Sequence, residues 1–348
     1  MALRPMAARE IPTMRVWVVD DPAPIESGSL VATSRAIPEP ADREVRVRVL
    51  TSGVCRTDLH LAEGDLAPVH RHTVPGHEIV GVVDALGRKA DRFSLGDRVG
   101  IAWLAQTCGD CRFCRRGAEN LCLDPRFTGW DRDGGYAEYA TAHEDFVYAL
   151  PVGYDDAHAA PLLCSGIIGY RALRRSRLPP GGRLGVYGFG ASAHLTAQIA
   201  LSEGARVHVL TRSAGARQLA LELGCHSVGG AFDEPPELLD SAVLFAPVGT
   251  LVPVALEALD RGGTLAIAGI HLSDIPVLDY DRHLFRERTV TSTTANTRRD
   301  GEELLALAAR IPLRIEVTEY SLDRADEALR DLAADRVNGA AVLRVSGD

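Results

Sequence analysis

The sequence predicts an α/β protein of two domains, the first rich in β-strands and the second built on a doubly wound parallel sheet. Three observations predict this fold class. The chain has 348 residues, more than one simple hydrophobic core usually holds. Its first part shows short strand-like runs, with no long helical period before about Asp155. From about Pro161, short apolar strands alternate with helical segments, which is typical of βαβ units.

Short strand-like runs define the first domain, which we expect to span residues 1–160. Two of these runs alternate between apolar and polar side chains, as half-buried strands do, and two are apolar runs bounded by glycines. In chain order they are residues 15–19, 44–50, 79–85 and 97–102. Residues 105–125 form a polar excursion between strand-like segments, which predicts a separate lobe.

Alternating strands and helices define the second domain, which we expect over residues 161–295. Gly204 and Gly224 each follow a helical segment and end it. A third segment, residues 296–348, holds the last helix and the last strand. The predicted helices are residues 159–173, 192–203, 214–223, 251–259 and 302–309, and the predicted strands are 183–187, 206–210, 242–247, 264–270 and 340–345.

Charge and hydropathy argue against several classes of function. The formal net charge is −9 and no basic run occurs, so neither nucleic acid nor an anionic membrane is an expected partner. No apolar run approaches the roughly 20 residues that a membrane-spanning helix needs. Residues 1–19 lack an apolar stretch before a small-residue cleavage site, so no signal peptide is expected. These features predict a cytoplasmic protein.

A glycine-rich turn lies between a predicted strand and a predicted helix, with the sequence GFGASA over residues 188–193. Gly188 permits the tight turn, Gly190 lets the backbone approach a pyrophosphate, and Ala193 lets helix and strand pack closely. The free N–H groups at the start of the helix, near Ala191, would hold the phosphates. The pattern predicts a dinucleotide site; the alternative is a turn without a ligand.

The end of the second strand of this domain indicates which dinucleotide is used. A carboxylate about 20 residues after the glycines would bind the ribose 2′-hydroxyl of NAD. The residues here are Thr211, Arg212 and Ser213, and none is a carboxylate. Hydroxyls and a guanidinium can receive a 2′-phosphate, which a carboxylate would repel. The sequence therefore favours NADP(H), with NAD(H) as the alternative if Arg212 lies over the adenine.

Six of the seven cysteines fall into two groups with the spacings of two kinds of zinc site. In one group Cys55 and Cys164 flank His77 in the sequence, and three ligands leave one coordination position open for chemistry. The alternative for these three residues is packing in a core. The other group can close a tetrahedron around a structural zinc, or hold an iron–sulfur cluster; it has the spacing C-x2-C-x2-C-x7-C and consists of Cys108, Cys111, Cys114 and Cys122.

Several motifs occur together in one order along the chain. GVCRTDLH at residues 53–60 precedes GHE at 76–78, the four-cysteine cluster, GDRV at 96–99, Cys164 and the glycine turn. In this order the chain resembles the zinc-dependent alcohol dehydrogenases of the medium-chain dehydrogenase/reductase superfamily over nearly its whole length. The resemblance implies a GroES-like catalytic domain, to which residues 296–348 return, and a Rossmann domain, with the active site in the cleft between them.

The resemblance also implies two zinc ions per chain. Cys55, His77 and Cys164 would hold the catalytic zinc, and the four-cysteine cluster would hold the structural zinc. A zinc ion with an open position supplies a Lewis acid for an alcohol or carbonyl oxygen. The implied activity is hydride transfer between an alcohol/aldehyde pair and a nicotinamide cofactor, with NADP(H) favoured over NAD(H).

Residues beside the zinc ligands resemble the rest of the catalytic machinery. Thr57 resembles the hydroxyl that takes the proton from the alcohol, since a hydroxyl both donates and accepts. His60 resembles the outer base of that proton relay, and the alternative for it is a surface histidine outside the reaction. Asp58 resembles the partner that orients the ring of His77, and Glu78 resembles a carboxylate with a modulatory role near the zinc.

Two arginines, Arg56 and Arg298, resemble contacts to the cofactor pyrophosphate. Residues 245–249 and 268–276 differ from the sequence most common in the family around the nicotinamide, so the identity of the substrate does not follow from the resemblance. His271 lies in the second of these segments, at the end of a predicted strand, where ligands bind in open α/β sheets. Two alternatives remain for His271: it contacts the nicotinamide or the substrate, or it is a polar loop residue.

Other functions on the same sequence are considered beside this one. A polyol or formaldehyde-type dehydrogenase would use the same scaffold. A non-catalytic nucleotide-binding redox sensor is a further alternative, against which the three open-site ligands argue, as do Thr57 and His60. The expected partner is a small-molecule alcohol or aldehyde, and the resemblance implies a homodimer or homotetramer.

Overall fold

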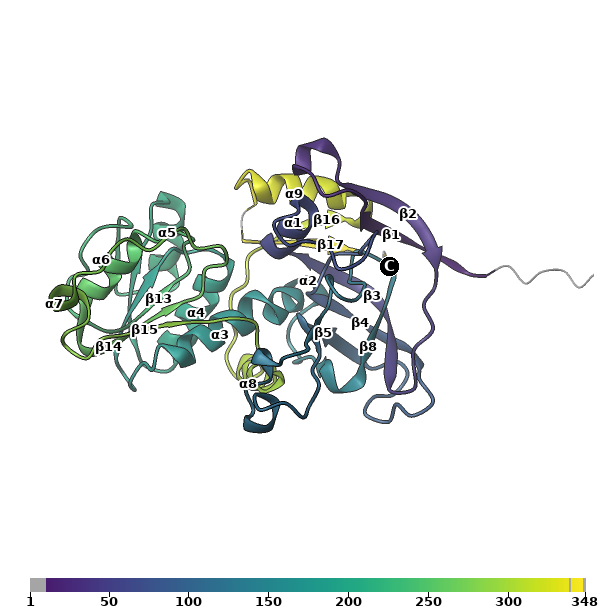
Figure 1. Ribbon diagram of the computed structural model, residues 1–348, viewed down its shortest axis with the longest axis horizontal. Helices are drawn as coiled ribbons and strands as arrows, with labels where there is room; N and C mark the ends of the chain where they lie inside the picture. The colour runs from purple at the N-terminus through teal and green to yellow at the C-terminus, as the bar shows by residue number, and fades with distance from the viewer. Residues whose placement is uncertain (1–10, 338, 347–348) are drawn as a thin grey trace, which may run out of the picture.

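The computed structural model describes residues 11–337 and 339–346. Two lobes lie side by side, and Figure 1 shows a sheet flanked by helices in one lobe and a larger β-rich body in the other. Residues 1–10, on which the expectation of no signal peptide partly depends, lie outside the described residues. Among the helices of this part of the chain, none combines the length and apolar character that crossing a bilayer requires.

The β-rich lobe is built on a seven-stranded sheet in the order β16-β17-β3-β4-β5-β9, with β8 also paired to β3. Two small sheets pair β1 with β2 and β6 with β7. Because β17 pairs antiparallel with β3, the end of the chain returns to the first domain. The strands are β1 (Thr13–Val19), β2 (Leu30–Ala36), β3 (Glu44–Val54), β4 (Ile79–Leu86), β5 (Arg98–Ile101), β6 (Leu104–Gln106), β7 (Arg126–Phe127), β8 (Tyr139–His143), β9 (Val147–Ala149), β16 (Val317–Ser321) and β17 (Ala340–Arg344).

Six parallel strands form the sheet of the other lobe, in the order β12-β11-β10-β13-β14-β15. The order reverses between β10 and β13, which creates the crevice where folds of this kind bind ligands. β10 and β11 span the residues that the sequence predicts. The strands are β10 (Arg183–Tyr187), β11 (Arg206–Leu210), β12 (Ser227–Gly229), β13 (Leu239–Leu244), β14 (Leu259–Ile267) and β15 (Thr289–Ser292).

Helices cover the parallel sheet and join the two lobes. α3 contacts both α4 and α8, and α1 contacts α9 at the other lobe. In Figure 1, α1 and α9 lie together above the β-rich sheet, and one end of α9 points toward the parallel-sheet lobe. The helices are α1 (Arg56–Glu63), α2 (Asp156–Ala159), α3 (Ser165–Arg175), α4 (Ala191–Ser202), α5 (Ala214–Glu222), α6 (Leu251–Ala258), α7 (Tyr280–His283), α8 (Arg298–Ala308) and α9 (Ala325–Ala333).

The helix predicted over residues 159–173 is wrong in one respect that matters for function. A 3-10 turn, η5 (Ala160–Leu163), comes first, and α3 begins only after Cys164. Cys164 itself has φ −128° and ψ −72°, outside the helical region. Pro161 has no backbone N–H and favours the start of a helical segment. The break lets Cys164 point away from the helix that follows it.

Other elements were missed or displaced for identifiable reasons. α1 has only eight residues, too few for a helical period to stand out. β13 and β14 start and end earlier than predicted, because the apolar residues after Leu244 and Ile267 continue into loops at the carboxyl edge of the sheet. The domain boundaries expected after residues 160 and 295 stay predictions; the first falls within η5, after its first residue.

One hydrophobic cluster crosses from the first lobe into the second. It contains Val80 and Val342 of the β-rich sheet together with Leu163 of η5 and Leu184 of β10, and all four are fully buried. Leu163 packs so closely on Gly100 that a Cβ at that glycine would approach its side chain to 2.8 Å. This packing holds the segment that carries Cys164 against the β-rich sheet.

We predict that Leu163→Ala lowers the free energy of unfolding by about 2–5 kcal/mol, since it leaves a cavity in a close-packed core. The thermal unfolding midpoint measures the loss. Leu95→Ala is the matched control, because Leu95 is 63% exposed, and it is expected to leave the midpoint nearly unchanged. Equal midpoints for the two variants would contradict the packing role.

Candidate active site

The three predicted ligands of the open metal site lie together in the structure. Cys55 ends the loop after β3, His77 precedes β4, and Cys164 lies between η5 and α3. Their ligand atoms, together with a carboxylate oxygen of Glu78, all lie within 4.8 Å of one another. The two Sγ atoms are 3.9 Å apart. A tetrahedral zinc with Zn–S bonds of about 2.3 Å places two sulfurs about 3.8 Å apart, so the donor set fits that ion.

The buried carboxylate of Asp58 positions two of these ligands. It accepts hydrogen bonds from the backbone N–H groups of Cys55 and Gly76, each at 2.9 Å. Its Oδ1 is 3.2 Å from Nδ1 of His77, so the ring keeps Nε2 for a metal. The hydroxyl of Tyr136 also donates to it at 3.4 Å. Asp58 and Tyr136 are 1% and 0% exposed, so the network is shielded from water.

Proton sharing shapes the electrostatics of the site. The hydrogen bond with the Cys164 thiol lowers the pKa of Cys55 well below its ordinary value, against the effect of burial. The same bond, with burial, raises the pKa of Cys164. Burial alone would lower the pKa of His77, but the charges and hydrogen bonds of Asp58 and Cys55 together outweigh it and raise that pKa well above its usual range. A divalent cation would take the place of these shared protons.

The side chain of Glu78 lies beside the three predicted ligands and fits there because residue 53 is a glycine. A Cβ at residue 53 would lie 2.0 Å from Oε2 of Glu78, so only glycine fits there. Glu78 is 2% exposed, and burial, followed by the negative charge of Cys55, raises its pKa well above the usual value. The sequence pattern gave no reason to single out Gly53, because the contact joins the end of β3 to the start of β4.

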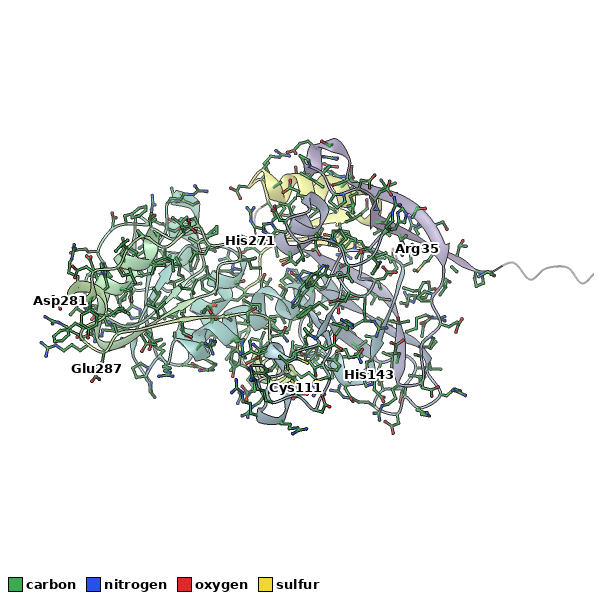
Figure 2. The ribbon with its side chains drawn as sticks, in the orientation of Figure 1. Arg35, Cys111, His143, His271, Asp281 and Glu287 are labelled. Carbon is green, nitrogen blue, oxygen red and sulfur yellow. The ribbon has the colours of Figure 1, made fainter. Side chains whose placement is uncertain are left out.

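The predicted relay residues lie on α1, at the opening of the site. Thr57 Oγ1 is 3.9 Å from Sγ of Cys55. His60 Nδ1 lies 2.9 Å from Oδ2 of Asp65, and its ring centroid is 4.2 Å from that of His271. Figure 2 places His271 between the two lobes. His271 therefore contacts the predicted outer relay histidine from the other lobe, whereas the sequence left its position open.

An aromatic group borders the open metal site, and sequence reasoning did not identify it. Trp103 meets the ring of His77 edge-on, with centroids 5.0 Å apart. On its other side it stacks on Phe127 at 4.8 Å and on Trp130 at 6.2 Å. Only 5% of the chain is aromatic, so a tryptophan five residues before Cys108 was the available signal. The group gives the site an apolar wall.

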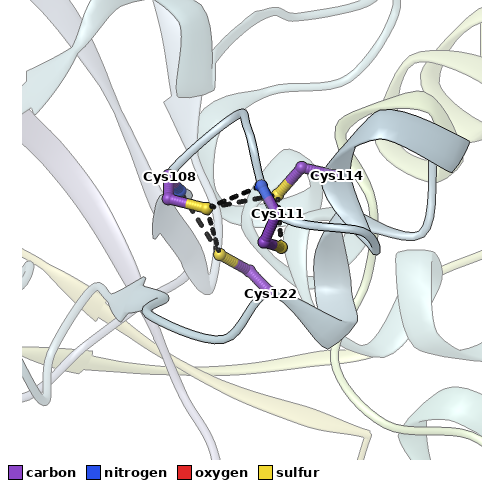
Figure 3. A group of neighbouring side chains, drawn as sticks. All are labelled: Cys108, Cys111, Cys114 and Cys122. Atoms are coloured by element: carbon purple, nitrogen blue, oxygen red, sulfur yellow. Dashed lines mark hydrogen bonds between the residues drawn. The ribbon is translucent and has the colours of Figure 1, made fainter.

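The four-cysteine cluster forms a second, closed donor set on the polar lobe. Figure 3 shows the four sulfurs turned toward one another. Sγ–Sγ distances are 3.9 Å from Cys108 to Cys114, 3.6 Å from Cys111 to Cys114 and 3.5 Å from Cys122 to Cys108. Backbone N–H groups also donate to these sulfurs, and the N–H of Cys114 does most to lower the pKa of Cys111 to about 6. The set fits a tetrahedral zinc.

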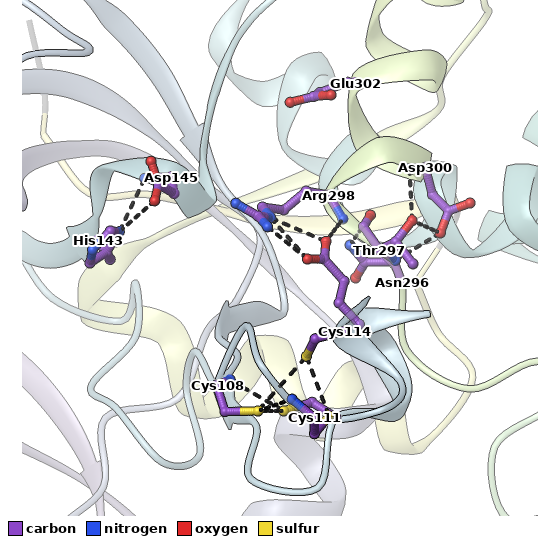
Figure 4. A network of polar contacts seen from close by, with 12 residues as sticks. Cys108, Cys111, Cys114, His143, Asp145, Asn296, Thr297, Arg298, Asp300 and Glu302 are labelled. Carbon is purple, nitrogen blue, oxygen red and sulfur yellow. Dashed lines mark hydrogen bonds and ion pairs between the residues drawn. The ribbon is translucent and has the colours of Figure 1, made fainter. Parts of the chain in front are cut away.

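Arg298, which the family resemblance places at the cofactor pyrophosphate, pairs with a carboxylate of the cysteine lobe in the structure. Its Nε lies 3.1 Å from each carboxylate oxygen of Glu119, and its Nη2 lies 2.8 Å from Oε2. Figure 4 shows Arg298 within its network of polar contacts. The guanidinium also lies over the ring of Phe146. Because Glu119 lies between Cys114 and Cys122, this pair ties α8 to the cysteine lobe. The pyrophosphate contact of Arg298 stays a prediction.

The glycine turn follows β10 and opens α4, as the sequence predicted. Gly188 has φ +84°, and a Cβ on it would lie 2.8 Å from the backbone nitrogen of Ala246. Gly190 is the N-cap of α4 and has ordinary φ −107°. No described atom would lie within 4 Å of a Cβ there. Ala191 begins the helix, and Ala193 is fully buried. The fold itself therefore requires Gly188 but not Gly190.

The predicted ribose-binding residues follow β11. Thr211 is buried, and its N–H donates to the carbonyl of Gly229 at 3.0 Å. Ser213 caps α5 by accepting from the N–H of Ala216 at 3.3 Å. The side chain of Arg212 is 89% exposed and lies 3.8 Å from Asp335, to which Arg56 is also paired.

Comparisons with known proteins agree with this geometry. Residues 41–152 match the family of the alcohol dehydrogenase GroES-like domain, and residues 191–310 match that of zinc-binding dehydrogenase. The "Probable alcohol dehydrogenase AdhA" of Mycobacterium tuberculosis is 58% identical, covering 96% of this chain and 98% of that protein. A cinnamyl alcohol dehydrogenase from Sorghum bicolor superimposes with a TM-score of 0.87 at 27% identity, covering 97% of this chain and 99% of that one.

A structure of the zinc-binding dehydrogenase type from Sinorhizobium meliloti, bound to NADP, superimposes with a TM-score of 0.82 at 25% identity, covering 96% of this chain and 100% of that one. The chain thus belongs to the zinc-type alcohol dehydrogenases of the medium-chain dehydrogenase/reductase superfamily. It is an alcohol dehydrogenase, an oxidoreductase that acts on a small molecule with a nicotinamide cofactor.

We predict that Gly190→Ala leaves the thermal midpoint unchanged but weakens NAD(P)H binding on the order of tenfold, equal to about 1.4 kcal/mol. The added methyl meets no protein atom and obstructs only a ligand. Gly188→Ala is the matched comparison, and it should lower the midpoint because it adds both a clash and left-handed strain. Nicotinamide fluorescence titration measures the affinity. Full affinity in Gly190→Ala would contradict the approach of a pyrophosphate at this glycine.

Proposed function

We propose that this alcohol dehydrogenase binds two zinc ions per chain and transfers hydride between an alcohol/aldehyde pair and NADP(H). The observation that carries the proposal is the convergence of Cys55, His77 and Cys164 beside an apolar wall and a hydroxyl. Three ligands of this type are the donor set of catalytic zinc sites with one open position. The closed four-cysteine set supports a structural role for the second ion.

A bound zinc would supply a Lewis acid that makes an alcohol more acidic or a carbonyl more electrophilic. The chain's own residues would move the proton and shape the pocket. Thr57, close to Cys55, is placed to accept the proton of the alcohol through its hydroxyl. His60 on the same helix would pass it outward, with Asp65 holding its Nδ1. Asp58 holds the ring of His77 from behind.

The cofactor preference rests on the end of β11. A carboxylate that would bind the ribose diol of NAD is absent from residues 211–213, while the guanidinium of Arg212, on a side chain that is 89% exposed, is present. The related structure from Sinorhizobium meliloti holds NADP. We therefore propose NADP(H) as the preferred cofactor. NAD(H) is the second candidate, for which Arg212 would lie over the adenine.

The substrate class follows from the wall beside His77. The three stacked rings of Trp103, Phe127 and Trp130 favour an apolar or aromatic alcohol or aldehyde. A polyol would leave its additional hydroxyls against apolar rings, which costs free energy. This observation favours the simple alcohol or aldehyde over the polyol alternative. A non-catalytic sensor would have no need of the relay hydroxyl beside an open metal site.

We also propose that the chain forms homo-oligomers through the outer edge of the parallel sheet. β15 is the last strand of that sheet. Large apolar side chains are exposed in the segment before it; they are Ile270 at 53%, Ile275 at 43%, Val277 at 98%, Tyr280 at 63% and Phe285 at 62%. A dimer or tetramer would cover them. Because six of the seven described cysteines are free thiols arranged as metal ligands, we also propose a reducing compartment such as the cytoplasm.

The activity is tested with purified, zinc-loaded protein against a panel of aromatic, aliphatic and polyol substrates, using both cofactors. We expect oxidation of apolar alcohols and reduction of their aldehydes, with metal analysis giving two zincs per chain. Absence of turnover on every substrate with either cofactor would contradict the proposal. Turnover confined to polyols or to formaldehyde would replace the substrate assignment and leave the reaction type intact.

We predict that Asp58→Asn weakens zinc binding at the open site on the order of 10- to 100-fold, because the variant loses the charge that orients His77. Competition with a chromophoric chelator measures the affinity. Asp323→Asn is the matched control, since Asp323 pairs with Arg15 and is 73% exposed. Unaltered zinc affinity in Asp58→Asn would contradict the orienting role.

We predict that Arg212→Ala weakens NADPH binding at least about fivefold while NADH binding stays within about twofold, since only NADPH carries the 2′-phosphate. Arg299→Ala is the control, because Arg299 is 83% exposed on α8. Fluorescence titration with each cofactor gives the two affinities. Equal losses for NADPH and NADH would mean that Arg212 does not read the 2′-phosphate.

A further inference from the structure

Asp335 stands in an unusual backbone conformation at the end of α9. The helix ends at Ala333, and Asp335 follows its C-cap with φ +53°. Glycine is the usual residue at this left-handed position, and aspartate is among the few others that tolerate it. The side chain is 64% exposed, so packing does not account for the choice of an aspartate.

The carboxylate of Asp335 bridges two arginines from different lobes. Its Oδ1 pairs with Nη2 of Arg56, in the first turn of α1. Its Oδ2 lies 3.8 Å from Nη2 of Arg212, which follows β11 of the parallel-sheet lobe. The bridge therefore links the β-rich lobe to the parallel-sheet lobe.

Stability offers little reason for this arrangement. The arginine side chains are 49% and 89% exposed, and exposed ion pairs of this kind contribute little to folding. The two arginines share another property, however. Both are expected to contact cofactor phosphates: the family resemblance implies the pyrophosphate for Arg56, and the proposed function assigns the 2′-phosphate to Arg212.

We infer that Asp335 is a specificity-determining residue, whose carboxylate competes with the 2′-phosphate of NADP(H) for Arg212. This competition lowers the ratio of the affinity for NADP(H) to the affinity for NAD(H). The inference rests on the dinucleotide site of the proposed function. A 2′-phosphate beside Arg212 brings close to two negative charges near the carboxylate, and like charges repel. NAD(H) presents a neutral hydroxyl at that place and meets no such repulsion.

Arg56 does not discriminate in this way, because both cofactors carry the pyrophosphate. Release of Arg56 from Asp335 would favour the two cofactors alike. The ratio of the two affinities therefore isolates the effect at Arg212, whereas either affinity alone does not. The ratio also separates an electrostatic role of Asp335 from a structural one, since a general loss of folding would weaken the binding of both cofactors.

The test measures dissociation constants for NADPH and NADH by fluorescence titration of the full-length, zinc-loaded protein. Asp335→Asn removes the charge and tolerates the same backbone conformation. We expect the affinity ratio to move toward NADPH by about fivefold at low salt, the factor of one exposed charge interaction. The shift should shrink in high salt, because exposed charges are screened.

Two further variants keep the inference falsifiable. Asp335→Gly relieves the left-handed strain, removes the carboxylate, and should move the ratio in the same direction. Asp323→Asn removes an exposed, arginine-paired charge on the same domain, and its ratio should equal that of the wild type. An unchanged ratio in both Asp335 variants, or a shift toward NADH, would overturn the inference.

The same titrations distinguish this inference from the proposed cofactor preference. If the wild type binds NADH more tightly but Asp335→Asn still moves the ratio toward NADPH, the preference for NADP(H) fails and the role of Asp335 stands. If the wild type prefers NADPH and the ratio does not move, the preference stands and the role of Asp335 fails. Binding of neither cofactor would overturn both.

Discussion

The buried carboxylate of Asp58 is the interaction on which the active site depends. It holds the backbone of two loops, at Cys55 and at Gly76, and it faces the ring of His77. A buried charge is costly unless it is paired and fully hydrogen-bonded. Here the N–H donors, the imidazole and the hydroxyl of Tyr136 satisfy it together. Two predicted metal ligands from separate segments, Cys55 and His77, are thereby held together.

The third ligand depends on the joint between the lobes. Cys164 lies where η5 gives way to α3, and Leu163 beside it packs in the cluster that crosses the two lobes. Two further contacts join the lobes, the ring contact between His60 and His271 and the bridge through Asp335. Chemistry at this site therefore depends on how the lobes sit relative to each other, as expected for dehydrogenases whose domains close around the cofactor.

The cysteine lobe adds a constraint of its own. Glu119 binds both the backbone N–H and the guanidinium of Arg298, and the side chain of Asn120 donates to the carbonyl of Thr294 at 2.9 Å. Both contacts hold the segment that returns from the parallel-sheet lobe to the β-rich lobe. A metal that keeps the four sulfurs together would therefore also keep this return segment in place.

The sequence by itself determined the parts that depend on local spacing. Apolar runs and glycines predict β10, β11 and the turn at Gly188, because backbone sterics act over a few residues. The compact spacing of the four cysteines likewise indicated one metal site. The tertiary structure decided what depends on residues distant in the chain. Four contacts connect residues of separate elements: the fit of Glu78 against Gly53, the aromatic wall of Trp103, the pairing of Arg298 with Glu119 and the bridge through Asp335. Such contacts leave no periodic trace in a sequence, since only the packing of strands and helices brings their partners together.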